Sequence, residues 1–517
     1  MTTIMNNIMS RIMNNIVDYA LNRITMYRLV LYYVAGLLAV ALGLGFFKLV
    51  PPDPTALAFS LLLITAVCWA TNRLFALLLR VPANTESVYI TALILALILP
   101  PATAADLMSV GGLVLACVVA IGSKFVLAIG RKHIFNPVAV GVAASALLLD
   151  QPATWWVGGN LTLLPFVLVG GLLVVRKVQR FDMVGTYVLA NLAVTLATSS
   201  AGQYGEALTQ SLLYSPLLFA GFAMLTEPLT APQAKWPRIA YGAMVGALCS
   251  PNIHLGEFYL TPEIALLIGN VFAYAVSPKG RFRLTLVRIE KMTSGCYDFI
   301  FKPDRKLDFQ PGQYLDWTLD VRNPDDRGNR RTFTIASAPT DSEVRLGVKF
   351  YRSPSAFKRS LSTMKPGDVI YGSQLAGDFT LPKDRGTKLA FIAGGIGVTP
   401  FRSMVQHMID RRDSRSVVVL YGNDKVDEIA YAEVFDRAER ELGIKTVYAV
   451  ADDRALGSNM HKGFIDAALI QREVPDFKER MFYISGPRAM VLRFRSVLRE
   501  LGVAHSRIRE DFFPGFA

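Results

Sequence analysis

The chain has 517 residues, of which 52% are hydrophobic and only 18% are charged, a composition typical of proteins with membrane-spanning segments. Its formal net charge of +13 would suit a nucleic-acid ligand, but the basic residues of the first half lie at the ends of apolar runs, as membrane topology requires, and this argues against nucleic acid. The four cysteines are far apart and form no CxxC motif, which argues against a disulfide scaffold and a cysteine-bound iron–sulfur centre; we expect no metal site.

Charge divides the chain into two parts. Residues 1–280 contain 15 Lys and Arg with 10 Asp and Glu, whereas residues 281–517 contain 39 and 31. The sequence therefore predicts a multidomain protein, with a polytopic α-helical membrane domain followed by a soluble part. In residues 1–24 the apolar positions recur four apart, which predicts an interfacial amphipathic helix; the apolar core and cleavage site of a signal peptide do not follow it.

Ten apolar segments follow between residues 25 and 279, the predicted membrane domain. Five are long enough to cross roughly 30 Å of hydrocarbon, and these are residues 27–50, 54–79, 108–130, 154–175 and 183–200. Five are shorter, and most of them begin or end at a proline: residues 87–100, 136–149, 212–226, 238–251 and 262–277. Short segments of this kind are typical of discontinuous helices that line a buried site.

The basic residues fall in alternate connections between these segments. All 15 Lys and Arg except Lys48 lie on or near one side. The opposite loops instead carry the acidic residues Asp53, Asp106, Asp150, Glu206 and Glu257. Since basic loops stay in the cytoplasm, we expect a multi-pass protein of a bacterial-type inner membrane, with both termini and the soluble part on the cytoplasmic side. Membrane lipid is therefore one expected partner.

The membrane domain contains a predicted internal repeat. A serine followed by twelve residues and then a proline occurs twice, 128 residues apart. A polar residue followed by a proline at the start of an apolar helix also occurs twice, 125 residues apart. These positions are Ser87 and Pro100 with Ser215 and Pro228, and Asn136-Pro137 with Thr261-Pro262. Because each copy has five helices, the second must enter the membrane from the opposite side, which predicts an inverted repeat with a site between the halves. Chance recurrence of Pro and Ser in apolar sequence is the alternative.

Three stretches of the membrane domain carry a resemblance to a known family: Arg131–Pro137 (RKHIFNP), Met224–Pro232 (MLTEPLTAP) and Tyr241–Gly246 (YGAMVG). They resemble the membrane subunits NqrB and RnfD of bacterial sodium-pumping and Rnf electron-transport complexes. The resemblance implies a ten-helix inverted-repeat fold that holds flavin inside the membrane. The family's Ser/Thr-Gly-Ala-Thr motif, whose Thr carries a covalent FMN, is absent between Thr195 and Ser215, so we expect a non-covalent FMN or riboflavin.

Glu227 is the candidate polar residue of this half. It lies between Thr226 and Pro228, at the end of a predicted broken helix. A carboxylate at that position could accept a hydrogen bond from a flavin ring or help to bind a cation. The alternative is an ordinary helix-end acid in cytoplasmic water.

From about residue 281 the pattern changes to short alternating strands. Six of them, separated by Gly and Pro turns, predict an antiparallel β-barrel over residues 281–385: Phe282–Glu290, Tyr297–Lys302, Gln313–Leu319, Arg331–Ser337, Val344–Tyr351 and Asp368–Tyr371. Buried runs that alternate with helical stretches then predict a parallel α/β domain over residues 386–517: Leu389–Ala393, Val417–Tyr421, Thr446–Val450 and Met481–Ser485.

Two motifs lie on these domains. Arg331–Ser337 (RTFTIAS) and Leu389–Phe401 (LAFIAGGIGVTPF) resemble, in the same order, the flavin and nicotinamide motifs of the ferredoxin–NADP reductase-like family. The resemblance implies that residues 281–385 bind FAD and that residues 386–517 bind NAD(P)H.

The residues of the first motif suit a flavin. Alternation along Arg331, Phe333 and Ile335 puts Arg331 and Phe333 on one face, so the guanidinium can pair with the pyrophosphate and the ring can pack on the isoalloxazine. Thr334 offers a hydroxyl to the edge of the flavin ring. Further along, Ser353 and Pro354 are the predicted N-cap and first residue of a short helix. Its amides at Ser355, Phe357 and Lys358, with the Lys358 ammonium, would face the same pyrophosphate.

The second motif has the context that a dinucleotide site requires, after a buried strand and before a helix. Gly394, Gly395 and Gly397 allow the backbone to approach a phosphate. Thr399 is the predicted N-cap of the helix, with Pro400 at its first position, which would make an anion site.

The C-terminal part completes the predicted site. Ser485 precedes Gly486 and Pro487, where the family usually has Cys, and its hydroxyl can still hydrogen-bond. Glu510 and Phe512 match the family's terminal acid and aromatic ring, with Phe513 as the alternative ring. The predicted catalytic residues are thus Thr334, Ser485, Glu510 and Phe512. Asn423 and Asp424 supply no cation for a 2′-phosphate, which favours NADH over NADPH.

Together the motifs predict an FAD-dependent NAD(P)H oxidoreductase. Electrons would pass from NAD(P)H through FAD to a flavin in the membrane domain, and then to a quinone, an extracytoplasmic acceptor or a flavin-bearing partner protein. A haem-containing reductase would need paired intramembrane His ligands, but His133 and His254 are predicted on opposite sides. A redox-gated transporter or an ion pump is the alternative that the inverted repeat leaves open.

Overall fold

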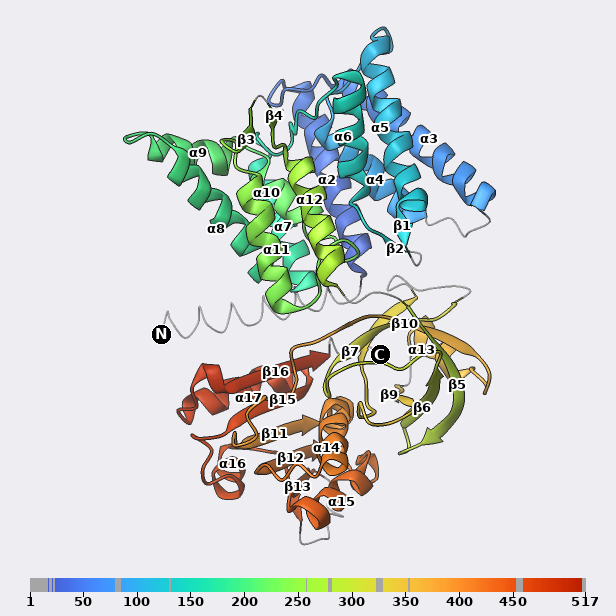
Figure 1. Cartoon of the computed structure of the whole chain (residues 1–517), viewed down its shortest axis with the longest axis vertical. Helices are drawn as coiled ribbons and strands as arrows, with labels where there is room; N and C mark the ends of the chain where they lie inside the picture. The colour runs from blue at the N-terminus through green and yellow to red at the C-terminus, as the bar shows by residue number, and fades with distance from the viewer. Residues whose placement is uncertain are drawn as a thin grey trace. The chain divides into compact units, whose positions relative to one another are not determined.

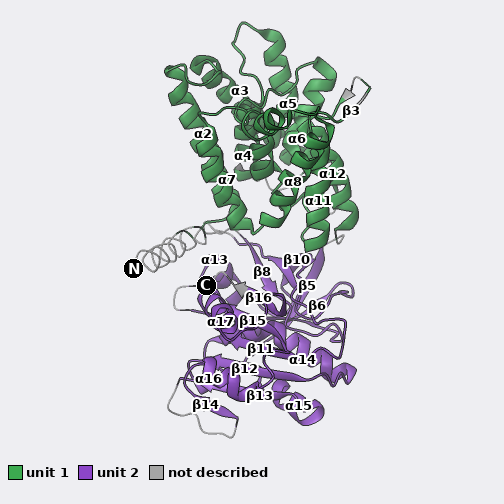
Figure 2. Ribbon diagram, turned by 90° about the vertical axis from the view of Figure 1, so that its left-hand side faces the viewer, with its two compact units in different colours: residues 1–279 green, residues 280–517 purple. Residues whose placement is uncertain are grey.

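The computed structural model (Figure 1) describes residues 17, 21, 24–79, 85–129, 132–256, 258–277, 281–321, 329–351, 354–451 and 459–513. The chain forms two compact units, unit 1 over residues 1–279 and unit 2 over residues 280–517 (Figure 2). Most of the amphipathic N-terminal segment predicted over residues 1–24 lies outside the described residues.

Unit 1 is built from helices. Their bounds are α2 Met26–Phe46, α3 Pro54–Leu79, α4 Thr85–Ile98, α5 Leu107–Val126, α6 Pro137–Leu149, α7 Leu164–Val178, α8 Phe181–Thr198, α9 Tyr204–Leu213, α10 Leu217–Phe219, α11 Lys235–Leu248 and α12 Pro262–Val276. A π-helical turn, Ala220–Met224, continues α10. Each of the ten apolar segments contains one of these helices, whereas α9 was not predicted.

One predicted segment is too long. Residues 154–163 form turns before α7, although the apolar run was predicted to be helical from residue 154. Trp155 has a positive φ of 50°, and a Cβ on Gly158 would lie 2.6 Å from the Cα of Pro216. The positive φ of Trp155 and the close approach at Gly158 keep residues 154–163 out of a helix, although their composition favours one.

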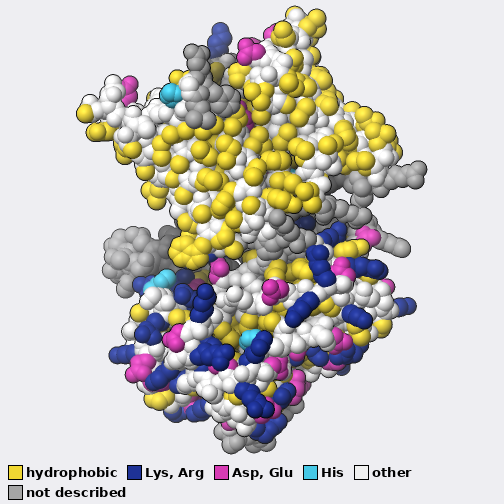
Figure 3. All heavy atoms as spheres, in the orientation of Figure 1, with side chains coloured by type: hydrophobic (Ala, Val, Ile, Leu, Met, Phe, Trp, Pro, Cys, Tyr) yellow, Lys and Arg dark blue, Asp and Glu magenta, His cyan; other side chains and the backbone are white. Residues whose placement is uncertain are grey.

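Four helices of the described residues are long and apolar enough to cross a membrane, namely α2, α3, α5 and α8. A fifth span is possible if α9 and the following α10–π-helical segment, which are bent by 50°, act as one. Apolar side chains cover most of the visible face of unit 1, whereas charged side chains of both signs are spread over unit 2 (Figure 3). Exposed Leu62, Leu77 and Leu189 belong to this apolar surface, which suits lipid.

A short hairpin precedes a short helix twice in unit 1. Strands β1 (Ala128–Ile129) and β2 (Lys132–His133) lead into α6, and strands β3 (His254–Leu255) and β4 (Phe258–Tyr259) lead into α12. Both helices begin with a proline, which suits the first helical turn. The two hairpins lie at opposite ends of unit 1 (Figure 1), as an inverted repeat requires.

Glycines allow close helix packing in unit 1. A Cβ on Gly246 of α11 would lie 2.0 Å from the carbonyl oxygen of Tyr187 in α8, and one on Gly141 of α6 would lie 2.3 Å from that of Ala116 in α5. The backbones of these helix pairs therefore touch, which is how helices associate in lipid.

Unit 2 begins with an antiparallel sheet of six strands in the order β8-β7-β10-β5-β6-β9. The strands are β5 Phe282–Lys291, β6 Cys296–Pro303, β7 Tyr314–Thr318, β8 Arg330–Thr334, β9 Val344–Lys349 and β10 Val369–Ala376, and helix α13 spans Ala356–Ser362. Side chains such as Phe299, Phe301, Trp317 and Phe357 fill the core that the sheet encloses.

A parallel sheet follows, in the order β14-β13-β12-β11-β15-β16. Its strands are β11 Leu389–Gly394, β12 Val417–Asn423, β13 Lys445–Val450, β14 Met460–Lys462, β15 Met481–Pro487 and β16 Ile508–Phe513; the α-helices are α14 Thr399–Arg411, α15 Ala432–Leu442, α16 Ala467–Glu473 and α17 Arg488–Glu500. The strand order reverses beside β11, and open α/β sheets bind ligands outside the carboxyl ends of strands at such a point.

Candidate functional site

The glycine-rich turn lies between β11 and α14, at the carboxyl end of the sheet. A Cβ on Gly394 would lie 2.2 Å from the Sδ of Met490, and one on Gly397 would lie 2.5 Å from the Cα of Gly486. These two glycines are therefore needed to pack the turn against the end of β15. Gly395 has a positive φ of 52° and open space where a Cβ would be, so its backbone is the one that a ligand can approach.

The predicted helix cap at Thr399 is wrong. A 3₁₀ turn over Gly395–Val398 leads directly into α14, so Thr399 already has helical dihedrals and Val398 occupies the cap position. The Thr399 hydroxyl donates to the carbonyl oxygen of Ile396 at 3.2 Å, and Pro400 follows within the first turn. The Thr399 hydroxyl therefore does not cap α14 as the sequence predicted. The glycine-rich turn nevertheless lies at the carboxyl end of β11, as expected.

Ser485 lies next to this turn, in register with Ala393 of β11 on one side and Asp511 of β16 on the other. Its side chain is fully buried, and its Oγ has no hydrogen-bond partner among the described residues. Burial raises the pKa of Asp511 to about 7. Paired residues of parallel strands share a face of the sheet, so the buried Ser485 and the half-buried Asp511 form one polar group.

Glu510, the acid predicted to be catalytic, lies on the opposite face of β16 because side chains alternate along a strand. Its Oε2 is 3.4 Å from Nη1 of Arg495 in α17. Burial raises the pKa of Glu510, and the Arg495 cation opposes that effect. The catalytic role of Glu510 stays a prediction, and the register with Ser485 adds Asp511 as a second candidate acid.

Gly486 and Pro487 end β15 and are in register with Phe512 and Phe513. The backbone of these two aromatic residues is therefore placed beside the Ser485 strand end. Their side chains lie outside the described residues, so the choice between Phe512 and Phe513 as the flavin-covering ring stays a prediction.

The first motif lies on β8 and faces α13. The Arg331 guanidinium is 5.4 Å from the ring centroid of Phe357, and the Phe333 ring is 5.9 Å from the same ring. Arg331 and Phe333 thus share a face, as the alternation predicts. Phe357 itself is fully buried, so only its backbone can contact a ligand.

The neighbouring predicted residues have defined partners. Thr334 and Ile335 are buried, and the Ile335 amide donates to the Gln313 carbonyl at 3.0 Å. Ser355 caps α13 by accepting from the Lys358 amide at 3.3 Å. The predicted cap, Ser353, lies outside the described residues, and Pro354 precedes the helix, so its predicted place at the first helical position is wrong.

The Lys358 ammonium contacts the end of β9. Its Nζ donates to the carbonyl oxygen of Lys349 at 2.7 Å and lies 5.0 Å from the ring centroid of Tyr351. A ligand that approached this ammonium would therefore share it with a backbone carbonyl.

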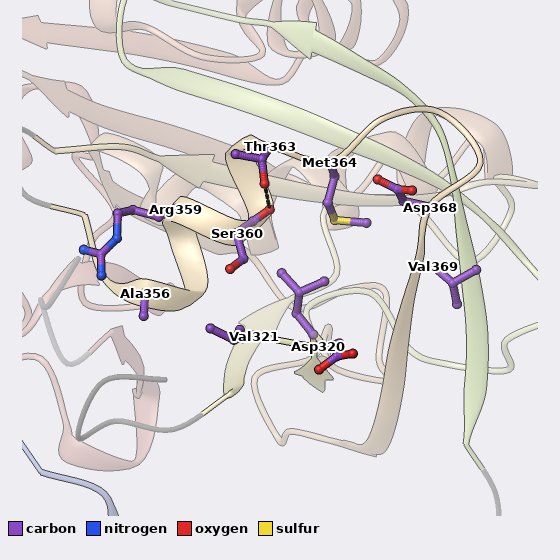
Figure 4. Close-up of a pocket in the computed structure, with 10 residues that line it drawn as sticks. Asp320, Val321, Ala356, Arg359, Ser360, Thr363, Met364, Asp368 and Val369 are labelled. Atoms are coloured by element: carbon purple, nitrogen blue, oxygen red, sulfur yellow. Dashed lines mark hydrogen bonds between the residues drawn. The ribbon is translucent and has the colours of Figure 1, made fainter. Parts of the chain in front are cut away.

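A hollow of about 580 Å³ lies between α13, the residues that follow β7 and the start of β10 (Figure 4). Asp320 and Asp368 contribute carboxylates to its wall. Arg359 also lines it, but its Nη1 donates to the carbonyl oxygen of Pro354 at 2.7 Å. The two carboxylates disfavour a phosphate group, so we do not assign FAD to this hollow.

In unit 1, Glu227 is held by three side chains, two of them from a distant part of the chain. Its carboxylate is 3.0 Å from Nε2 of His133, and it accepts from Nδ2 of Asn136 at 2.9 Å and from the Thr230 hydroxyl at 3.3 Å. The Glu227 side chain is only 17% exposed. It is therefore not the water-exposed helix-end acid of the alternative interpretation.

Two further contacts extend the Glu227 cluster. The backbone N–H of Asn136 donates to Oδ1 of Asn270 in α12 at 2.8 Å, which ties the start of α6 to the other half of the repeat. Nearby, the Lys124 ammonium donates to three oxygens of the first turns of α4: the Ser87 carbonyl, the Ser87 hydroxyl and the Thr91 hydroxyl. A basic and an acidic side chain are thus both half-buried at this end of unit 1.

Comparison with known proteins finds one family model in each unit. Residues 157–278 match the NQR2, RnfD, RnfE family, and residues 391–495 match the oxidoreductase NAD-binding domain. Each unit of the chain thus contains a region that matches one of these families. Both resemblances noted in the sequence are confirmed, and together with the four long apolar helices the first match identifies a membrane protein.

Curated relatives match the second half. A flavohemoprotein of Bacillus cereus is 28% identical over 241 residues, which cover 44% of this chain and 60% of that protein. An NADPH oxidoreductase of Mycobacterium tuberculosis is 25% identical over 260 residues, which cover 49% of this chain and 64% of that protein. The chain thus spans about 60% of the length of the flavohemoprotein that it matches. Among solved structures, the FAD/NAD-binding domain of the Vibrio cholerae nitric oxide dioxygenase covers 45% of this chain and 98% of its own, with 21% identity and a TM-score of 0.40.

Proposed function

We propose that the chain is a membrane-bound NAD(P)H oxidoreductase. Electrons pass from NAD(P)H through FAD, held by residues 281–517, to a non-covalent FMN or riboflavin held by residues 25–279, and then to a quinone or an extracytoplasmic acceptor. The observation that carries this proposal is the buried Ser485 hydroxyl, which has no hydrogen-bond partner among the described residues and lies in register with Asp511, on a strand end that packs against Gly397 of the glycine-rich turn. A buried hydroxyl without a partner is costly, so a ligand atom is its expected partner.

The residues of β8 fit FAD. Arg331 would pair with the pyrophosphate, Phe333 would pack on the isoalloxazine and the buried Thr334 would hydrogen-bond its edge. Bound flavin would accept a hydride and release electrons singly. On the nicotinamide side, Ser485 would hydrogen-bond the nicotinamide, and the Asp511 carboxylate would stabilise the positive charge that develops on it.

NADH is the proposed donor. Asn423 ends β12 at the carboxyl edge of the sheet, and both its side-chain amide atoms are buried without a partner among the described residues. An amide with a free donor and acceptor suits the two hydroxyls of a ribose, and Asp424 beside it would repel a 2′-phosphate.

The Glu227 cluster is the proposed site of the membrane flavin. Asn136 and His133 supply donors, and Glu227 supplies an acceptor, so both kinds of polar atom on a flavin ring could be satisfied. The basic loops of unit 1 support a cytoplasmic position for this end and for the reductase domains.

The test compares two neighbouring arginines of β8 in the full-length protein. Arg331→Ala should weaken FAD binding about tenfold to a hundredfold, since a hydrogen bond to a charged group contributes about 1.5–3 kcal/mol. Arg330 is the matched control, because it lies on the other face of the strand, 3.8 Å from Asp316. Equal FAD occupancy in both variants would contradict the flavin assignment.

A second measurement tests the membrane flavin. Acid precipitation of the purified protein should release all flavin into the supernatant, and the amount should exceed one flavin per chain. Fluorescence that stays with the denatured polypeptide would show a covalent attachment, and a single flavin would remove the second carrier.

The paired hairpins and short helices of unit 1 favour one other candidate, a redox-gated transporter or ion pump. Movement of solute or ions into vesicles without any nicotinamide would support this candidate over electron transfer.

A further inference from the structure

The segment between β12 and α15 contacts both sheets of unit 2. It covers residues 424–431, follows Asn423, the proposed ribose-binding residue, and ends at Tyr431. Within it, Oε2 of Glu428 is 2.8 Å from Nζ of Lys349, at the end of β9 in the antiparallel sheet. The segment therefore connects the proposed NADH site with the sheet that carries the proposed FAD residues of β8.

Tyr431 extends from this segment onto the antiparallel sheet. Its side chain is buried, and a Cβ on Gly347 of β9 would lie 2.6 Å from its hydroxyl oxygen. Gly347 is in register with Asp298 of β6, and residues paired in this way share one face of the sheet. The Tyr431 hydroxyl therefore lies beside the Asp298 carboxyl group. In agreement with this, burial raises the pKa of Tyr431 and the charge of Asp298 raises it further.

Two polar atoms at this contact lack a hydrogen-bond partner. Asp298 is fully buried, and its Oδ2 accepts from Nη1 of Arg345 at 2.8 Å. Its Oδ1 and the Tyr431 hydroxyl have no hydrogen-bond partner among the described residues. Each of these atoms costs free energy when it is buried without a partner. A hydrogen bond from the Tyr431 hydroxyl to Oδ1 of Asp298 would remove both costs.

The two groups belong to different sheets. Asp298 is part of β6, whereas the backbone of Tyr431 is held by the parallel sheet. The amide of the preceding residue, Ala430, donates to the hydroxyl of Tyr421 in β12 at 3.2 Å. Tyr431 itself has a positive φ of 60°, which is unusual for a bulky residue and persists only where the surroundings fix it. A hydrogen bond between Tyr431 and Asp298 would therefore act on the separation of the two sheets.

We propose that Tyr431 is a positioning residue for hydride transfer. The inference rests on the proposed function, in which NADH bound beside Asn423 reduces FAD on the antiparallel sheet. In the NADH complex the Tyr431 hydroxyl donates to Oδ1 of Asp298, and this closed arrangement holds the two sheets at the separation that the transfer requires. The hydride takes two electrons and one proton from the nicotinamide to the flavin, and neither Tyr431 nor Asp298 gains or loses a proton.

The experiment uses the full-length protein in lipid nanodiscs. Anaerobic stopped-flow absorbance gives the limiting rate of flavin reduction and the Kd for NADH. Tyr431→Phe should lower the ratio of this rate to the Kd at least about tenfold, as for loss of a hydrogen bond to a charged group, because the closed arrangement becomes rarer. Without nucleotide, the variant should unfold at no lower temperature than wild type, since it has no unpaired hydroxyl to bury. NAD⁺ should raise that temperature less than in wild type.

Tyr448→Phe is the matched control, because the Tyr448 hydroxyl already donates to a carboxylate, Oδ1 of Asp436, at 3.2 Å. It should lower the unfolding temperature and leave the ratio unchanged. An unchanged ratio in Tyr431→Phe overturns the positioning role, and so does an equal fall of the ratio in both variants. Loss of FAD or of ligand-free stability in Tyr431→Phe also overturns it, because Tyr431 would then only support the fold. A wild-type protein whose flavin is not reduced by NADH overturns the proposed function itself.

Discussion

Glu227 and Asp511 are both shielded carboxyl groups at the ends of structural elements, but their surroundings differ. Glu227 has three side-chain neighbours within hydrogen-bond distance, one of them the imidazole of His133. For Asp511, burial is the cause of its raised pKa, and no donor within the described residues offsets it. Several donors fix the orientation of the Glu227 carboxylate, whereas an acid whose pKa is raised by burial alone can change its protonation near neutral pH. The first arrangement suits a carrier site, and the second suits a reacting site.

Asp511→Asn gives the largest expected effect, because it removes the charge of the group without partners. In the wild-type protein, FAD reduction by NADH should accelerate as pH rises through about 7, where the carboxylate forms. Above that pH the variant should be about tenfold to a hundredfold slower and should show no pH dependence. Stopped-flow absorbance of the flavin measures this rate. A variant with the wild-type pH profile would show that Asp511 is not near the reacting atoms.

Stability separates this effect from damage to the fold. The folded protein keeps the Asp511 proton up to about pH 7, whereas the unfolded chain releases it near its ordinary value of about 4. Between these values the folded state binds more protons, so this group lowers stability as pH rises. Asp511→Asn removes the loss and should be more stable than wild type above neutral pH, by about 1–4 kcal/mol. Thermal unfolding followed at two pH values checks the sign.

Glu227→Gln is expected to have an intermediate effect, on a different step. The substitution keeps the size of the side chain and removes its charge, so the contacts with His133 and Asn136 weaken. Reduction of a quinone or an external acceptor should slow about tenfold, as expected for loss of charged hydrogen bonds, while ferricyanide reduction at FAD stays at the wild-type rate. Glu206→Gln serves as the control, because Glu206 is an exposed acid of α9 in the same unit. Equal slowing of both reactions would mean that the Glu227 cluster only supports the fold.

The sequence predicted the order of helices and strands well, since periods of 3.6 and 2 residues are local properties. It located Glu227 through the Thr226-Glu227-Pro228 break in an apolar run. It could not supply the partners of Glu227, because His133 and Asn136 are 94 and 91 residues away in the chain.

Two details of the site depend on single positions in the sequence. Glu510 and Asp511 are adjacent in sequence, and only the pairing of β16 with β15 decides which of them faces Ser485. The Thr399 cap failed for a similar reason, because the glycine-rich turn is already helical when it reaches that residue. Pattern alone cannot fix a register or the residue at which a helix begins.

Ser485→Ala is expected to have the smallest effect, and it tests why an unpartnered hydroxyl is present beside Asp511. The buried Oγ has no hydrogen-bond partner among the described residues, so no hydrogen bond offsets the free energy that its removal from water costs. Alanine removes that cost and should stabilise the ligand-free protein by about 1 kcal/mol.

If the hydroxyl bonds to nicotinamide, the same change should raise the KM for NADH about fivefold, because one neutral hydrogen bond contributes about 1 kcal/mol. Ser485→Cys, which fills the same space with a weaker donor, should give an intermediate KM. A stabilised variant with an unchanged KM would place the nicotinamide elsewhere, and Asp511 would then lose its proposed role as well, since the two residues share one face of the sheet.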